Sequence, residues 1–180
     1  MNTLELTTDR LIMRRLDISD STGFFAYRSL PEIYEFQSFK PIDMRDADKF
    51  IDGVAEHPNI PSTWFQLAVC LKSNNRLIGD IGIHFLEDDA QVEIGYTIAP
   101  YFQGQGYARE ALNRVIDYLF SDLSKHRIIA SVDPNNKRSI NLIEKLSMRK
   151  EAHFIKSIKT NGEWTDDCIY AMLNEEWPRH

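Results

Sequence analysis

The chain has 180 residues, of which 43% are hydrophobic and 27% charged, and its net charge is −6 at pH 7. These values are typical of a single globular domain spanning 1–180, and they exclude collagen-like, coiled-coil and disordered classes. The acidic balance argues against a nucleic-acid-binding surface, because phosphate binding requires clustered Lys and Arg. It favours a cationic partner such as an amine.

No window approaches 18 consecutive apolar residues, so we expect no membrane span. The first residues lack the basic start and apolar run of a signal peptide. The two cysteines, Cys70 and Cys168, cannot form a disulfide framework and are expected as small core residues. We therefore expect a cytoplasmic protein with reduced thiols. The histidines show no metal-ligand spacing, so no metal is expected.

The spacing of apolar residues predicts three elements in the first sixty residues. A strand spans 10–16, and Asp17 caps the helix that follows it. Pro31 ends this helix, and the aromatic segment 32–39 is expected to be irregular. A second helix follows Asp43 and carries apolar residues at helical spacing: Phe50, Ile51 and Val54.

The spacing of apolar residues then changes from that of helices to that of strands. Three strands joined by short turns indicate an antiparallel meander. They span 64–71, 77–86 and 91–98. The clearest helix is 107–120, whose apolar residues recur at i, i+3, i+4 and i+7. The remaining elements are a strand (127–132), a short helix carrying Ile140, Ile143 and Leu146, and two strands (151–159 and 167–173) joined by Asn161-Gly162. This order predicts a mixed α+β sheet.

The segment between the third meander strand and the clearest helix carries the chemistry. Gly104 and Gly106 let the backbone turn tightly and approach a ligand. The first N–H groups of the following helix lack internal partners and lie at the positive end of its dipole. The segment therefore predicts a phosphate or pyrophosphate cradle, although such a loop is also found as a plain tight turn. A P-loop would need a Lys after the last Gly, and a dinucleotide fingerprint would need Gly at Arg109.

Gln103-x-x-Gly106-x-Ala108 matches the Gln/Arg-x-x-Gly-x-Gly/Ala signature of the GNAT superfamily of acyl-CoA-dependent N-acetyltransferases. Further segments resemble motifs of this family in the same order, so that the resemblance covers most of the chain. Together they resemble the branch containing the Rim-type ribosomal-protein N-terminal acetyltransferases. These segments are Thr8–Arg14, Ile78-Gly79-x-Ile81-Gly82, Glu93-Ile94-Gly95-Tyr96, and Asn136-x-x-Ser139 followed by Glu144-Lys145-Leu146.

The resemblance implies a mixed sheet of about seven strands with about four helices, splayed between the fourth strand (91–98) and the fifth (127–132). Acetyl-CoA, as co-substrate, would lie in the gap. Its pantetheine arm would bond to backbone near Tyr96, Thr97 and Ile98. Its pyrophosphate would meet the loop and helix start formed by Gln103, Gly104, Gln105, Gly106, Tyr107, Ala108 and Arg109. Asn136 and Ser139 are the remaining cofactor-binding candidates, and Asn136 would hold the pantetheine or position the next helix.

The implied reaction is direct attack of a primary amine on the thioester in a ternary complex, without a metal. An ammonium group must first lose a proton. Glu93 is the first candidate base, with a plain cross-strand charge as the alternative reading; Asp80 and Glu35 are weaker candidates. A backbone N–H near Ile98 could stabilise the oxyanion.

The acid that protonates the departing thiolate is less well defined. Many relatives place a Tyr four residues after the motif Ser, and here that position is Ile143. Ser139 is the nearest substitute, and its alternative role is helix capping. A thiolate is also a tolerable leaving group without help, because the pKa of a thiol is about 8.5.

The expected acceptor is a protein N-terminal amine. A small amine, such as a polyamine, amino acid or antibiotic, is an alternative, and so is a non-catalytic acyl-CoA-binding module. The sequence leaves open whether the protein forms a homo-oligomer. His84 is expected to be a packed or solvent-facing residue rather than a catalyst, and three aromatic residues are expected in the core: Trp64, Phe65 and Phe85.

Overall fold

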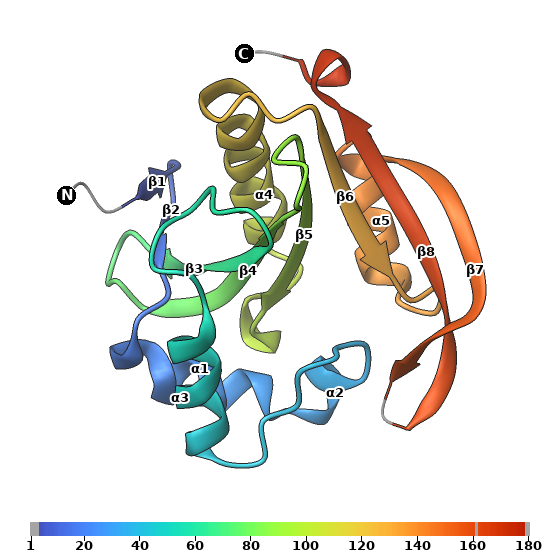
Figure 1. The fold of residues 1–180 in the computed structure, drawn as a ribbon. Coiled ribbons are helices and arrows are strands. Elements are labelled where there is room, and N and C mark those ends of the chain that lie inside the picture. Colours follow the sequence, from blue (N-terminus) through green and yellow to red (C-terminus); the bar gives the residue numbers. More distant parts are fainter. Residues whose placement is uncertain (1–3, 161, 179–180) are drawn as a thin grey trace.

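A mixed eight-stranded sheet forms the centre of the computed structural model, which describes residues 4–160 and 162–178 (Figure 1). Its strand order is β1-β2-β3-β4-β5-β6-β8-β7. The strands are β1 (Glu5–Thr7), β2 (Leu11–Arg15), β3 (Thr63–Leu71), β4 (Leu77–Phe85), β5 (Gln91–Ile98), β6 (Arg127–Val132), β7 (Arg149–Thr160) and β8 (Glu163–Leu173). The α+β class is confirmed, and β1 is a strand that the sequence analysis missed.

Five α-helices flank the sheet within the described residues. They are α1 (Ser21–Arg28), α2 (Pro31–Tyr34), α3 (Met44–Gly53), α4 (Tyr107–Asp117) and α5 (Lys137–Lys145). Two expectations were wrong here. Pro31 begins α2 instead of only ending α1, because proline is favoured in the first helical turn. Val54 lies beyond α3 in extended backbone.

The expected antiparallel meander is confirmed in β3, β4 and β5. The next strand, β6, runs parallel to β5, and the two pair at three positions, from Gln91 opposite Arg127 to Glu93 opposite Ile129. Beyond Glu93 the strands diverge, as Figure 1 shows. The splay between 91–98 and 127–132 is therefore where the resemblance placed it.

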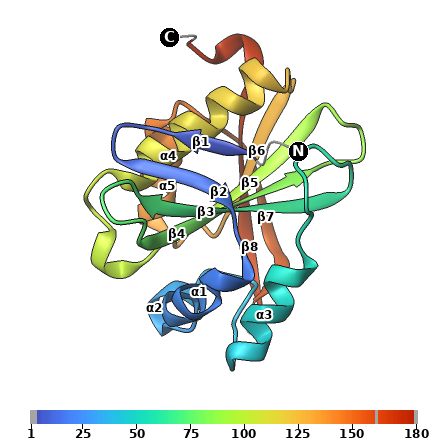
Figure 2. The ribbon, with the colours of Figure 1, turned by 90° about the vertical axis from the view of Figure 1, so that its left-hand side faces the viewer.

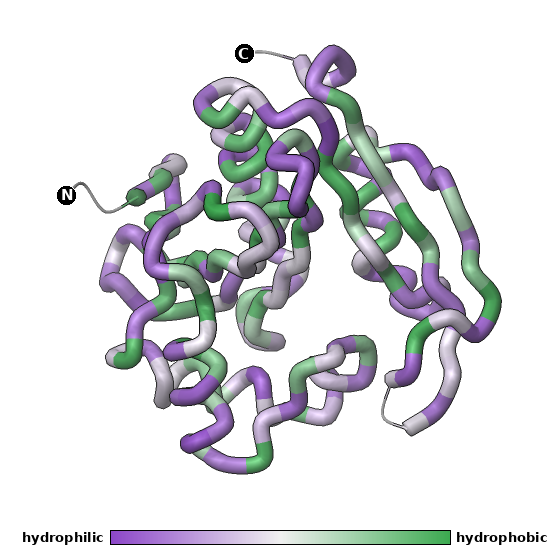
Figure 3. Tube along the Cα trace, viewed as in Figure 1, coloured by the Kyte–Doolittle hydropathy of each residue, from purple (hydrophilic) through white to green (hydrophobic). Residues whose placement is uncertain are grey.

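The helices divide between the two faces of the sheet (Figure 2). On one face α4 packs against β5, β1 and β2, and α5 packs against β6. On the other face α1 packs against β4 and α3. Along α4, hydrophobic and hydrophilic residues alternate with the helical turns (Figure 3), because one side of the helix is buried in the core. A π-helical turn, Tyr118–Asp122, follows α4, so the expected helix 107–120 is not α-helical throughout.

The hairpin of β7 and β8 forms the far edge of the sheet. Its strands are longer than the predicted 151–159 and 167–173, and four of its large apolar side chains are exposed. Of the predicted turn Asn161-Gly162, Asn161 lies outside the described residues, and Gly162 has a φ of 90°. The exposed side chains are Phe154, Ile155, Ile158 and Trp164.

The hydrophobic core contains most of the residues expected there. Phe65 and Phe85 are fully buried, and Cys70 and Cys168 are buried free thiols. Trp64 is an exception, because 42% of its surface is exposed. No helix in the described ranges is long and apolar enough to span a membrane.

Candidate active site

The loop before α4 has the backbone geometry that its two glycines predict. Gly104 has a φ of 75° and Gly106 a φ of 84°, in the left-handed region that side-chain-bearing residues avoid. A Cβ on Gly104 would meet nothing within 4 Å, so the loop presents bare backbone to open space. Gly106 directly precedes α4 and cannot cap it with a side chain. The first N–H groups of α4 are thus available to an anion.

Gln103, the first residue of the signature, ties the loop to two other elements. Its Nε2 donates to the carbonyl oxygen of Ile98 at the end of β5 (2.8 Å). Its Oε1 accepts from Arg138 on α5 (3.1 Å). The side chain therefore fixes the loop between β5 and α5, and Gln105 adds a bond from its Nε2 to the carbonyl of Tyr101 (2.9 Å).

Arg10 clamps the same loop from the N-terminal side. Its guanidinium donates to the carbonyl oxygen of Gln105 (3.1 Å), pairs with Glu110 on α4 (2.6 Å) and lies 4.3 Å from the ring centre of Tyr107. Thr8 adds a hydrogen bond to Glu110 (2.5 Å). Sequence reasoning assigned Arg10 only to a strand motif. The only sequence signal for this role of Arg10 was its place in the motif, because its partner Glu110 lies 100 residues away in the chain.

The hydroxyl groups of Tyr96 on β5 and Ser139 on α5 meet across the open end of the β5–β6 gap, with their oxygens 2.8 Å apart. Burial raises the pKa of Tyr96 to about 12. Asn136 accepts a hydrogen bond from the N–H of Ser139 (3.1 Å) and so caps α5. Asn136 therefore positions the helix, the second of its two expected roles, and Ser139 is not the cap. Ile143, which stands where many relatives place Tyr, is buried.

Glu93 lies at the last pair of the β5–β6 ladder and is half-buried, with 34% of its side chain exposed. Burial raises the pKa of Glu93 above its usual value; His84 on β4 opposes this rise and Asp167 on β8 adds to it. Asp167 is itself buried and accepts a hydrogen bond from Ser131 on β6 (2.7 Å). A half-buried carboxylate with a raised pKa is suited to accept a proton near neutral pH.

The neighbouring row of the sheet offers space on the face that carries Glu93 at Gly95, whereas Gly82 is crowded by Gln66 and Trp64. Gly82 and Gly95 pair directly across β4 and β5, and side chains two residues apart on a strand share a face. A Cβ on Gly95 would meet nothing within 4 Å. Thr97 comes next on this face; its Oγ1 is buried and has no hydrogen-bond partner among the described residues.

The two weaker base candidates lie in other surroundings. Asp80 is fully buried and accepts hydrogen bonds from Tyr27 (2.6 Å), from Arg28 (2.5 Å) and from the side chain of Gln66. Its carboxylate is therefore committed to an internal ion pair. Glu35 is exposed at the end of α2.

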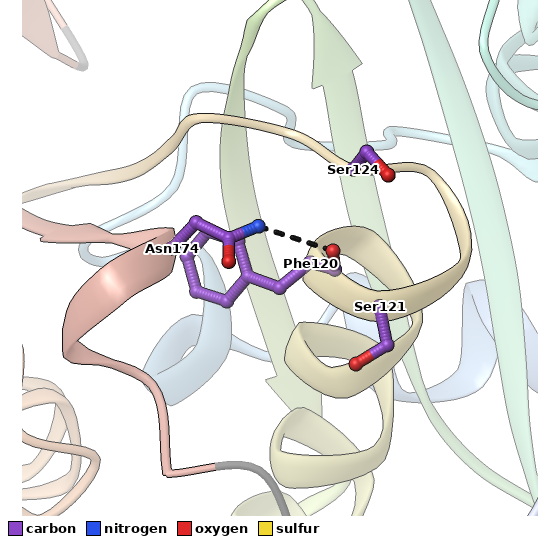
Figure 4. A pocket seen from close by; sticks show the side chains of 4 residues that line it. All are labelled: Phe120, Ser121, Ser124 and Asn174. Carbon is purple, nitrogen blue, oxygen red and sulfur yellow. Dashed lines mark hydrogen bonds between the residues drawn. The ribbon is translucent and has the colours of Figure 1, made fainter.

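A pocket of about 360 Å³ lies away from the loop, beside the π-helical turn (Figure 4). Phe120, Ser121, Ser124 and Asn174 line it. The amide of Asn174 donates to the carbonyl oxygens of Phe120 (3.1 Å) and Lys125 (2.8 Å), which fastens the C-terminal turn to this end of the helix. Its lining includes no acid, base or cation, so we assign no catalytic role to this pocket. In the described part of the chain, no cluster of His, Cys, Asp and Glu could hold a metal ion.

The geometry of the gap and the loop coincides with a family match. The model of the acetyltransferase (GNAT) domain matches residues 10–149, which include β2, the meander, the loop, α4 and α5. This chain belongs to the GNAT family of N-acetyltransferases. The GNAT chain is 31% identical to the uncharacterized N-acetyltransferase YnaD of Bacillus subtilis, over 97% of this chain and 99% of that one.

Two other relatives have a substrate in their names. The GNAT chain is 34% identical to the [ribosomal protein uS5]-alanine N-acetyltransferase of Escherichia coli, over 47% of this chain and 43% of that one. It is 29% identical to the spermidine N(1)-acetyltransferase of Vibrio cholerae, over 72% of this chain and 88% of that one. Among solved structures, a GNAT-family acetyltransferase from Bacillus anthracis superposes with a TM-score of 0.87 at 29% identity, covering 96% of this chain and all of that one.

Proposed function

We propose that this GNAT enzyme transfers the acetyl group of acetyl-CoA to a primary amine at a protein N-terminus, by direct attack in a ternary complex. The observation that carries the proposal is the break in the β5–β6 ladder after Glu93, beside a loop whose backbone is bare at Gly104 and Gly106. An extended amide-containing chain can pair with the open edge of β5. The anion at its end can meet the N–H groups at the start of α4.

The residues present fit acetyl-CoA, which when bound supplies a thioester that an amine can attack with the CoA thiol as leaving group. The N–H groups from Gly104 to Arg109 would bind the pyrophosphate. Backbone of Tyr96, Thr97 and Ile98 would bind the pantetheine arm, with the N–H near Ile98 facing the developing oxyanion. The carbonyl of Ile98 accepts from Gln103 with one lone pair, which leaves its second lone pair for the pantetheine.

Glu93 would accept the proton that the acceptor ammonium must lose, directly or through a water. Its raised pKa supports this role, since the carboxylate is a stronger base than an exposed one. The hydroxyls of Tyr96 and Ser139 would donate hydrogen bonds to the departing sulfur. Net transfer of the tyrosine proton is unfavourable, because its pKa of about 12 exceeds the value of about 8.5 for a thiol.

A protein acceptor is favoured by the exposed apolar side chains of the β7–β8 hairpin. Phe154, Ile155, Ile158 and Trp164 are exposed apolar side chains on the two faces of the hairpin, which a polypeptide can contact and a polyamine would leave uncovered. The end of the hairpin and α2 lie at the same end of the molecule (Figure 1). A second candidate is a small polyamine, which the paired negative charges of Glu93 and Asp167 favour.

The test is acceptor-dependent thiol release from acetyl-CoA, measured with a thiol-reactive dye. The panel contains peptides beginning Ser, Ala and Met, the same peptides with acetylated N-termini, Lys-side-chain peptides, spermidine and an aminoglycoside. We expect release with free N-termini and none with the blocked peptides. Release with spermidine alone would replace the first candidate by the second.

A parallel measurement separates catalysis from binding. Glu93→Gln is expected to lose about 10²–10⁴-fold in turnover while its acetyl-CoA affinity, measured by calorimetry, stays unchanged. Tight acetyl-CoA binding without release from any acceptor would favour a non-catalytic acyl-CoA-binding module.

A further inference from the structure

Three residues that are separate in sequence stand in one row across the centre of the sheet. Trp64 on β3 is directly opposite His84 on β4, and His84 is directly opposite Glu93 on β5. Directly opposed residues of antiparallel strands project from the same face. The row therefore places an imidazole between an indole and the carboxylate that we propose as the base.

The contacts within this row are specific. His84 Nδ1 lies 4.0 Å from Glu93 Oε2, too far for a hydrogen bond and close enough for an attraction between charges when the ring is protonated. The rings of Trp64 and His84 are parallel, with an interplanar angle of 7° and centroids 4.8 Å apart. Both His84 and Glu93 are partly exposed, at 28% and 34% of their side chains. A proton on this pair thus has a path to water.

We propose that His84 is a positioning residue for Glu93 and the relay through which the proton taken from the acceptor leaves the site. The proposal rests on the proposed function, in which Glu93 is the base. Transfer requires the 4.0 Å between Glu93 Oε2 and His84 Nδ1 to shorten to a hydrogen bond, and the soft terminal torsion of Glu93 lets its carboxyl group move.

The proton balance of the relay is simple. The ammonium N–H bond breaks and a carboxyl O–H bond forms on Glu93. This O–H bond then breaks as an N–H bond forms at Nδ1 of His84, and the imidazolium loses a proton to water. Glu93 returns as a carboxylate and His84 as a neutral ring, so no further reactant is needed.

The two charges facing Glu93 act on different steps: Asp167 favours uptake of the proton by Glu93, and an imidazolium at His84 favours its release. Glu93 faces His84 from β4 and Asp167 from β8. Asp167 disfavours a second negative charge beside it, and an imidazolium at His84 favours the carboxylate form of Glu93. The stacked indole of Trp64 holds the imidazole ring in one plane beside Glu93.

Loss and rescue of the imidazole test the relay. His84→Ala leaves a ring-sized space beneath Trp64, and we expect turnover with the best acceptor to fall about 10-fold to 100-fold, less than the loss for the base itself. Free imidazole in the assay is expected to restore most of the activity. His57→Ala, which removes an exposed histidine after α3, is the matched control and should keep full activity with or without imidazole. Full activity in His84→Ala, or a loss that imidazole does not repair, would overturn the relay.

A second measurement does not depend on turnover. In protein labelled with ¹³C at the glutamate carboxyls, His84→Gln should move the titration of Glu93 to higher pH, because an opposing positive charge is lost. An unchanged titration would overturn the positioning role. If wild-type protein acetylated no acceptor, the proposed function would fail, and this titration would still decide whether the two side chains act as a pair.

Discussion

The hydroxyl oxygen of Tyr96 on β5 lies 2.8 Å from that of Ser139 on α5, so a hydrogen bond crosses the gap where the two halves of the sheet part. The resemblance to the family predicted a hydroxyl group at this place from α5 alone. The position of the usual Tyr is taken by the buried Ile143. A tyrosine from the opposite wall of the gap stands beside the serine instead.

This pair predicts a modest effect of removing the phenol. With a pKa of about 12, Tyr96 stays protonated at neutral pH and can donate a hydrogen bond to a thiolate without transferring its proton. Tyr96→Phe should therefore cost about 1 kcal/mol in kcat, or roughly fivefold. Steady-state kinetics checks this, with Tyr101→Phe as the exposed control. A loss of about a thousandfold would instead make Tyr96 an essential acid.

The glycines of the loop predict a separable loss of acetyl-CoA affinity. Alanine at Gly104 or Gly106 would have to adopt a positive φ, at about 1–2 kcal/mol, or change the shape of the loop. Either result weakens the binding of acetyl-CoA, by about tenfold for each variant. Calorimetry measures the affinity and thermal melting checks the fold. Gly53→Ala, at the end of α3 with open space around the new methyl group, should bind normally.

Asp80 predicts a loss of stability rather than of chemistry. Asp80→Asn leaves the buried guanidinium of Arg28 without its counter-charge, which costs about 3–5 kcal/mol. Urea unfolding at neutral pH measures this loss. Glu35→Gln, at an exposed site, should change stability by less than about 0.5 kcal/mol. An Asp80→Asn protein as stable as the wild type would show that the ion pair contributes little.

Asp167 predicts a shift in pH dependence. Glu93 must be a carboxylate to accept a proton, so kcat/KM falls as the pH drops through its pKa. Burial, with help from Asp167, raises this pKa, so Asp167→Asn lowers it and moves the acid limb to lower pH. The asparagine can still accept from Ser131, which preserves that contact. If the acid limb of the kcat/KM profile does not move, the charge of Asp167 does not influence the pKa of Glu93.

The elements that were predicted well carry their signals locally. Each strand of the meander, α4 and the glycine loop is defined within fewer than twenty residues by spacing, turns or two glycines. The strand β1 was missed because three residues give too short a pattern. α2 was missed because proline was taken only as a helix breaker.

The site was harder to predict where it depends on distant pairs. Nothing near Asp80 in sequence indicates an ion pair with Arg28, 52 residues away. The aromatic character of Trp64 suggested the core, yet its strand register places it over His84 on a partly exposed face. Alternation identifies the two faces of a strand but does not reveal which face a helix leaves uncovered.

The three residue pairs that join β5 to β6 have a consequence for hydrogen exchange. The hydrophobic core passes beneath both halves of the sheet, with Val92, Ile128 and Tyr170 among its members. The hydrogen-bonded ladder between β5 and β6 ends at Glu93. The amides along the open edge of β5 therefore depend on a bound chain for protection against hydrogen exchange. Slower deuterium uptake between Ile94 and Ile98 would report occupancy of the gap even by a ligand that never reacts.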